Sequence, residues 1–244
     1  MDDGSVLKDT LAYTYGANEA LALWRLTSEK RYLADANRWV IVLIEKIKHD
    51  ASPIGTQQTA SLFLTLTLQN LKLKDEAVNL ALKARTQFNN ALVTNAPTNF
   101  AGFAELVRTF ILLDKIEPSN NYKEVSWEII EWILSYKKPT ALTHRAPWNA
   151  TTTGGLSYSR SIAKIAEILI IMAREDDKRA LVCQESYESA LSWLEKMRYH
   201  EENMYFIPAS MQKRMAGSIR SSLINPEAWI DTVGHVLLAS SREK

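Results

Sequence analysis

Two residues near the C-terminus have the types and spacing of a general base and a carboxylate that would orient it. Asp231 and His235 are four residues apart, so they share one face of a helix. Arg220, in the preceding loop, could add a positively charged clamp. A surface or capping pair is the alternative. The apolar residues around the pair favour a helix packed against the core: Trp229, Ile230, Val233 and Leu237.

A second group of polar and aromatic residues lies in the long loop at residues 140–155. His144, Arg145 and Trp148 combine a titratable ring, a cation and an indole platform, which together could bind a sugar or an acidic group. The alternative is structural. Trp148 would fill the core, while His144 and Arg145 would be solvated.

The starts of two expected helices supply further candidates. Tyr15 and Glu19 enter the first helix, where Glu19 could act as an acid or favour the positive helix end. Tyr158 and Arg160 follow two glycines, whose backbone would permit close approach to a ligand but would equally serve an ordinary tight turn.

Several familiar chemistries have no motif in this sequence. It contains no GxSxG nucleophile elbow, no Walker-type or dinucleotide glycine loop and no HExxH zinc helix. The four histidines are far apart, and a single cysteine excludes an intrachain disulfide and the usual thiolate zinc sites. We therefore expect no metal and no cofactor, and we expect Cys183 to be a buried small hydrophobe.

Helices must position these residues, because apolar side chains recur at helical spacing along most of the chain. The expected antiparallel pairs are 14–27 with 32–47, 56–71 with 75–88, 98–113 with 125–136, and 162–170 with 187–197. Polar turns join the two members of each pair: residues 28–30, 72–74, 117–120 and 175–178.

The C-terminal part departs from this pattern. Residues 203–225 carry no convincing helical period, and residues 204–207 would form a short strand or an ordered loop. A last helix is expected to start with Asn225 as its N-cap, Pro226 at the first helical position and Glu227 at the positive end. The sequence thus predicts a single all-α domain over residues 1–244.

Successive helical hairpins predict a solenoid or a closed ring, because one pair cannot bury its apolar face alone. An open superhelix would bind protein partners. A closed α/α toroid would place loops and helix ends around a central funnel suited to small molecules.

Three segments resemble hairpins of the six-hairpin (α/α) toroid superfamily, which includes N-acylglucosamine 2-epimerase relatives and several glycoside hydrolases. They are residues 15–33, 154–160 and 219–235. The resemblance implies an (α/α) toroid or a partial toroid. A complete ring needs more helices than the sequence predicts, so this chain could be a fragment of a longer toroid. Residues 77–84 also resemble the second helix of a tetratricopeptide repeat, whose regular period the other hairpins lack.

The balance of charge argues against nucleic acid and membrane partners. Lys plus Arg (29) nearly equals Asp plus Glu (28), which leaves no basic footprint. No secretory signal and no apolar run long enough to cross a bilayer is present, so we expect a cytoplasmic protein.

The leading hypothesis is a carbohydrate-directed toroid protein that performs acid and base chemistry on a sugar, as a glycosidase or epimerase does. Asp231, His235 and Glu19 would be catalytic. The expected substrate-binding residues are Tyr15, His144, Arg145, Trp148, Tyr158, Arg160 and Arg220. The alternative is a non-catalytic helical-repeat scaffold that binds a protein partner through a concave surface.

Overall fold

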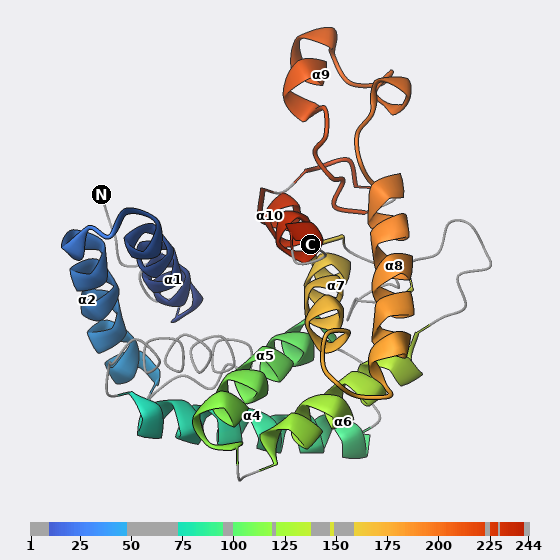
Figure 1. Ribbon diagram of the computed structural model, residues 1–244. Coiled ribbons are helices and arrows are strands. Elements are labelled where there is room, and N and C mark those ends of the chain that lie inside the picture. The colour runs from blue at the N-terminus through green and yellow to red at the C-terminus, as the bar shows by residue number, and fades with distance from the viewer. Residues whose placement is uncertain are drawn as a thin grey trace. The chain divides into compact units, whose positions relative to one another are not determined.

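Helices make up nearly all of the regular structure in the part of the chain that the structure describes (Figure 1). The computed structural model describes residues 10–47, 73–94, 100–118, 121–137, 147–148, 159–222, 225–228 and 230–241. Over these residues the extended pairings are isolated antiparallel bridges, Arg198 with Ile219 and Arg220 with Ala228. The all-α prediction is confirmed for these residues. No helix among them is long and apolar enough to cross a membrane.

The helices follow the predicted order. In chain order they are α1 (Thr10–Thr27), α2 (Lys30–Ile47), α4 (Lys74–Thr94), α5 (Phe100–Ile116), α6 (Tyr122–Ser135), α7 (Ser159–Met172), α8 (Ala180–Lys196), the short 3-10 helix η3 (Glu201–Asn203), α9 (Ala209–Met215) and α10 (Ile230–Ser241). The helix expected at residues 56–71 lies outside the described residues.

The chain divides into two compact units. One comprises Met1–Asn95 and Glu105–Trp127, and the other comprises Ala96–Ala104 and Glu128–Lys244. We refer to them as unit 1 and unit 2. The single domain expected over residues 1–244 and its toroidal arrangement both stay predictions.

Unit 1 contains the predicted hairpin of α1 and α2. Tyr13 and Trp39 join the two helices through their rings, whose centroids lie 5.0 Å apart. The turn begins at Ser28, whose N–H donates to the Trp24 carbonyl oxygen at 2.7 Å. Ser28 has a φ of 58°, which is the left-handed conformation that commonly ends a helix.

We expect Ser28→Gly to raise the free energy of unfolding by about 1 kcal/mol, because a side chain in the left-handed region is strained and glycine is not. Chemical denaturation of the two proteins measures the difference. Ser28→Ala is the control, since it keeps the Cβ atom and should give no gain. Equal stability of the glycine and alanine variants would contradict the prediction.

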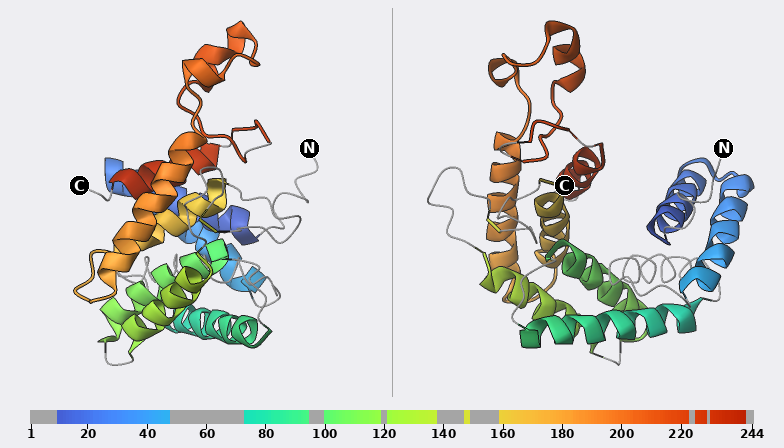
Figure 2. Two further views of the ribbon diagram at one scale, coloured as in Figure 1. Left: turned by 90° about the vertical axis from the view of Figure 1, so that its right-hand side faces the viewer. Right: turned by 180° about the vertical axis from the view of Figure 1, so that it is seen from behind.

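In unit 2, α7 is an almost completely buried helix. It packs between α8, its antiparallel partner, and α10, as Figures 1 and 2 show. The Tyr187 hydroxyl on α8 donates to the Ala239 carbonyl oxygen of α10 at 3.3 Å. The three helices therefore share one core, to which α7 contributes every residue from Ile162 to Ile170.

Trp148 lies in the core of unit 2. Its side chain is 0% exposed. Its Nε1–H donates to the Ile133 carbonyl oxygen of α6 at 2.9 Å. Trp148 thus occupies the core position that was one of its two predicted roles, with its one polar atom satisfied.

The chain between α8 and α10 forms a projection that we call the arm, residues 199–217. At its base the Tyr199 N–H donates to Ser218 and the Gly217 N–H donates to Tyr199, at 2.8 and 2.9 Å. Residues 204–207 form turns, so the ordered-loop alternative is the correct one. The short helix α9 was not predicted, because seven residues carry too little apolar periodicity to reveal a helix.

The predicted start of the last helix is wrong. Asn225, Pro226 and Glu227 are not helical, and α10 begins at Ile230. The Asn225 side-chain oxygen instead accepts the Glu227 N–H at 3.0 Å, and the Glu227 carbonyl oxygen accepts the Ser221 N–H at 2.6 Å. Residues 225–228 therefore pair with residues 220–222 and do not form the first turn of the helix.

Candidate functional site

A stripe of charged residues runs along buried helix α7. Arg160, Lys164 and Glu167 are spaced four and three residues apart, so they lie on one helical face. Lys164 and Glu167 are both buried, and Arg160 is half-buried. Burying charged groups is costly unless they are paired or hydrogen-bonded, and functional sites are where proteins often accept that cost.

Glu167 holds the imidazole of His235, which comes from α10. Nδ1 of His235 lies 3.2 Å from Oε2 of Glu167. The Glu167 side chain is 1% exposed and the His235 side chain is 17% exposed. A buried carboxylate thus meets an imidazole that keeps contact with solvent.

An imidazole paired with a carboxylate in this way is the arrangement that a general base requires. An ionised Glu167 would accept a hydrogen bond from Nδ1–H of His235, which would leave Nε2 with its lone pair. The charge of an ionised Glu167 would also stabilise the imidazolium formed when Nε2 takes a proton. The sequence predicted this role for His235 with Asp231 as the orienting carboxylate. The side chain of Asp231 lies outside the described residues, and the carboxylate that the structure shows is Glu167.

Buried hydroxyl groups lie on the same helices and beside them. Ser159 is the first residue of α7, and its N–H donates to the Ser221 carbonyl oxygen at 2.8 Å. Thr232 precedes His235 by one turn of α10. The hydroxyl oxygens of Ser159, Ser221 and Thr232 are buried and have no hydrogen-bond partner among the described residues. Each keeps a donor and acceptors for a further polar group.

Arg220 lies at the base of the arm. Its guanidinium donates to the Lys196 carbonyl oxygen at 3.0 Å, at the end of α8, and its carbon Cζ lies 5.9 Å from the centre of the Tyr199 ring. Its backbone pairs with Met197 and Ala228. These contacts join α8, the arm and the segment before α10. The predicted charge clamp stays a prediction.

The other predicted site residues lie in unit 1 or outside the described residues. Glu19 belongs to unit 1 and is exposed in the middle of α1. The expectation that Glu19 stabilises the N-terminus of this helix is therefore wrong. The following predicted residues or their side chains lie outside the described residues: Tyr15, His144, Arg145 and Tyr158. The described residues therefore leave the convergence of the full predicted set untested.

Sequence reasoning missed Lys164 and Glu167. A signal was present, because two charged residues interrupt the apolar run from Ile162 to Ile170 at helical spacing. On an amphipathic helix such residues face solvent. On α7 they are buried, because neighbours cover the helix all round, and only tertiary packing reveals that.

Cys183 is a buried thiol of α8. Burial raises the pKa of the Cys183 thiol to about 12, so the thiol stays protonated near neutral pH. The prediction of a buried, hydrophobe-like cysteine is confirmed. Within the described ranges, no three His, Cys, Asp or Glu side chains gather in a way that could hold a metal ion.

Comparison with known proteins identified no relative of this chain. No protein-family model matches the sequence, and no curated protein or solved structure matches the chain.

Proposed function

We propose that this chain binds a sugar or sugar derivative beside α7 and α10 and that His235 transfers a proton to and from it. The observation that carries the proposal is the Glu167–His235 pair, in which a buried carboxylate contacts an imidazole that is 17% exposed. A proton-transfer group of this kind contributes about 10²- to 10⁴-fold to a reaction rate.

The class of ligand comes from the resemblance of residues 15–33, 154–160 and 219–235 to toroid hairpins of sugar-acting enzymes. His235 belongs to the third of these segments, and Arg160 to the second. Both residues lie in unit 2, on helices that pack against each other. The proposal includes the toroidal or partly toroidal arrangement and the cytoplasmic location that the sequence predicts.

The test is a thermal-shift screen of the purified chain against neutral sugars, sugar acids and sugar phosphates. A ligand present at about 100 times its dissociation constant stabilises the folded state by roughly 2.7 kcal/mol, which is a readily detected shift in Tm. We expect at least one sugar to stabilise the wild type. His235→Gln should weaken that stabilisation.

The matched control is His200→Gln, which changes an exposed histidine on the arm. It should respond to the sugar as the wild type does. If no sugar, sugar acid or sugar phosphate shifts the Tm of the wild type, the sugar-directed proposal fails. The alternative of a protein-binding scaffold then becomes the better account.

A further inference from the structure

The arm, residues 199–217, is an ordered element whose outer surface the described chain leaves uncovered. It leaves the body after α8 and returns before α10, and it stands clear of the other helices of unit 2 in the views of Figures 1 and 2. Arg198 and Glu195 form an ion pair of 2.8 Å at its base. The Arg198 guanidinium also donates to the Gly217 carbonyl oxygen at 3.2 Å, which joins the two ends of the arm at its base.

Hydrogen bonds inside the arm fix its shape without a large core. The Gln212 side-chain amide donates to the carbonyl oxygens of Met204 and Ile207 at 3.2 and 2.9 Å. The Asn203 amide donates to the Arg198 carbonyl oxygen at 2.9 Å. The two Gln212 bonds join the outgoing limb (residues 200–207) to the returning limb (residues 208–216), so the surface of the arm is formed within a single chain.

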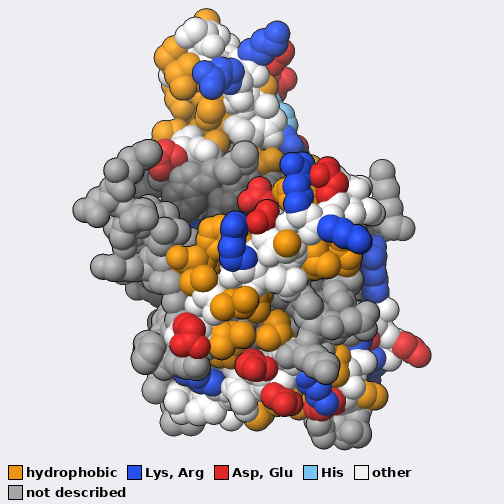
Figure 3. All heavy atoms as spheres, turned by 90° about the vertical axis from the view of Figure 1, so that its left-hand side faces the viewer, with side chains coloured by type: hydrophobic (Ala, Val, Ile, Leu, Met, Phe, Trp, Pro, Cys, Tyr) orange, Lys and Arg blue, Asp and Glu red, His pale blue; other side chains and the backbone are white. Residues whose placement is uncertain are grey.

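Large apolar side chains of both limbs face solvent. Tyr205 is 87% exposed, Phe206 is 50% exposed and Met211 is 47% exposed. Hydrophobic side chains gather on the arm in Figure 3, with Lys and Arg side chains beside them. Clustered exposed aromatic and methionine side chains are typical of protein interaction sites, where they supply most of the binding energy.

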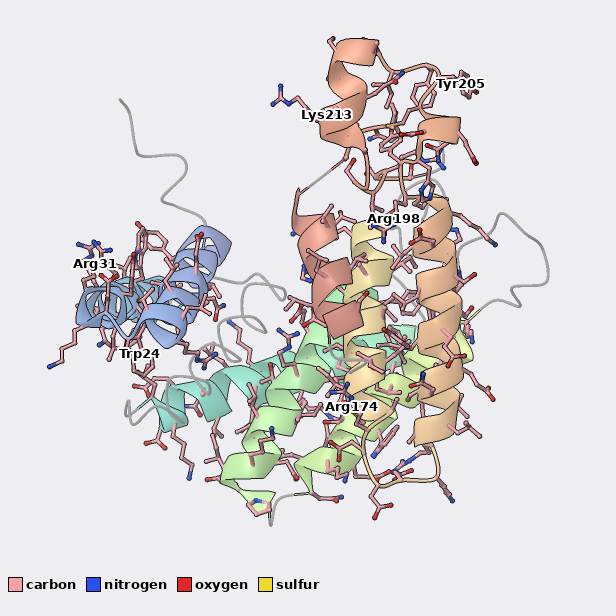
Figure 4. All side chains as sticks on the ribbon, turned by 45° about the horizontal axis from the view of Figure 1, so that its top comes forward. Trp24, Arg31, Arg174, Arg198, Tyr205 and Lys213 are labelled. Atoms are coloured by element: carbon pink, nitrogen blue, oxygen red, sulfur yellow. The ribbon has the colours of Figure 1, made fainter. Side chains whose placement is uncertain are left out.

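The charges of the arm are separated between its two limbs. Glu201 and Glu202 lie on the outgoing limb, and Lys213 and Arg214 lie on the returning limb. All four side chains are exposed, and none of them forms an ion pair in the described part of the chain. Figure 4 shows Tyr205 and Lys213 pointing to opposite sides of the arm. We call the outgoing limb, which carries Glu201, Glu202 and Tyr205, the acidic edge, and the returning limb, which carries Lys213 and Arg214, the basic edge.

We propose that the arm is a dimerisation element that packs against the arm of a second copy of this chain. In a contact with twofold symmetry, residue i of one copy meets residue j of the other and j meets i. Two arms placed face to face would set the acidic edge of each against the basic edge of the other. Tyr205, Phe206 and Met211 would be covered between them.

Charge complementarity favours a second copy over another partner. The arm carries two acidic and two basic exposed side chains, which makes it complementary to itself and gives it no net attraction for a strongly acidic or basic surface. Lys213 and Arg214 would also meet the aromatic rings of Tyr205 and Phe206, which attract cations. This inference does not depend on the proposed sugar chemistry.

The test measures molecular mass by analytical ultracentrifugation across roughly 1 to 300 µM, the range in which a small interface dissociates. The wild type should be a dimer at the upper end. The double variant Lys213→Glu with Arg214→Glu makes every edge acidic and should be monomeric. The double variant Glu201→Lys with Glu202→Lys makes every edge basic and should also be monomeric.

Mixing the two variants should restore a dimer with one copy of each, because acidic and basic edges then face each other again. Phe206→Ser should weaken the wild-type dimer. Leu26→Ser, at an apolar residue of α1 that is 83% exposed, is the matched control and should not. A wild type that stays monomeric at the highest concentration would overturn the proposal. So would a mixture of the two charge variants that fails to associate.

Discussion

Trp148→Ala is expected to lower the free energy of unfolding by about 3–5 kcal/mol, the usual cost of removing a buried tryptophan. The indole is fully buried, and its Nε1–H satisfies a carbonyl oxygen of α6. Its removal leaves a cavity in the core of unit 2 and deprives the Ile133 carbonyl oxygen of this donor. Chemical denaturation followed by far-UV circular dichroism measures the change.

Two further variants test how the cost depends on lost volume, on the lost hydrogen bond and on burial. Trp148→Phe keeps much of the volume but loses the Nε1–H donor, so it should cost less than the alanine variant. Trp24→Ala removes a half-buried tryptophan of α1 and should also cost less. A Trp148→Ala protein within about 1 kcal/mol of the wild type would show that Trp148 does not fill the core.

Glu167→Gln is expected to reduce the rate on any sugar that the protein converts by about 10²- to 10⁴-fold. The substitution keeps the size of the side chain but removes the charge that stabilises the His235 imidazolium. The amide can also donate to Nδ1 of His235, which moves the ring hydrogen to Nε2 and blocks the base. Initial rates with the sugar that most stabilises the wild type measure the effect.

A spectroscopic readout distinguishes this role from a loss of folding. Nitrogen-15 NMR should show the hydrogen of the neutral wild-type ring on Nδ1 and should show it shift toward Nε2 in Glu167→Gln. Glu185→Gln, at an exposed position of α8, is the matched control and should leave both the rate and the His235 signals unchanged. An unchanged His235 tautomer in Glu167→Gln would mean that Glu167 does not orient the ring.

The helical content of this chain could be predicted from the sequence because helix formation depends on local spacing. The turns at residues 28–29 and 175–178 fall where the sequence places them. The start of α10 was predicted wrongly from an equally local signal. The Asn225-Pro226-Glu227 segment has the residues of a helix start, but its backbone bonds to residues 221 and 222 instead.

The sequence alone determined the all-α class and the order of the described helices, and it identified His235 as a candidate base. Each of these follows from residue types at short spacing. Only the tertiary structure shows that the Glu167 carboxylate contacts His235. Glu167 and His235 are 68 residues apart in the chain, and no periodicity relates them. It also decided that the charged stripe of α7 faces inward, because burial of a helix on all sides is a property of its neighbours.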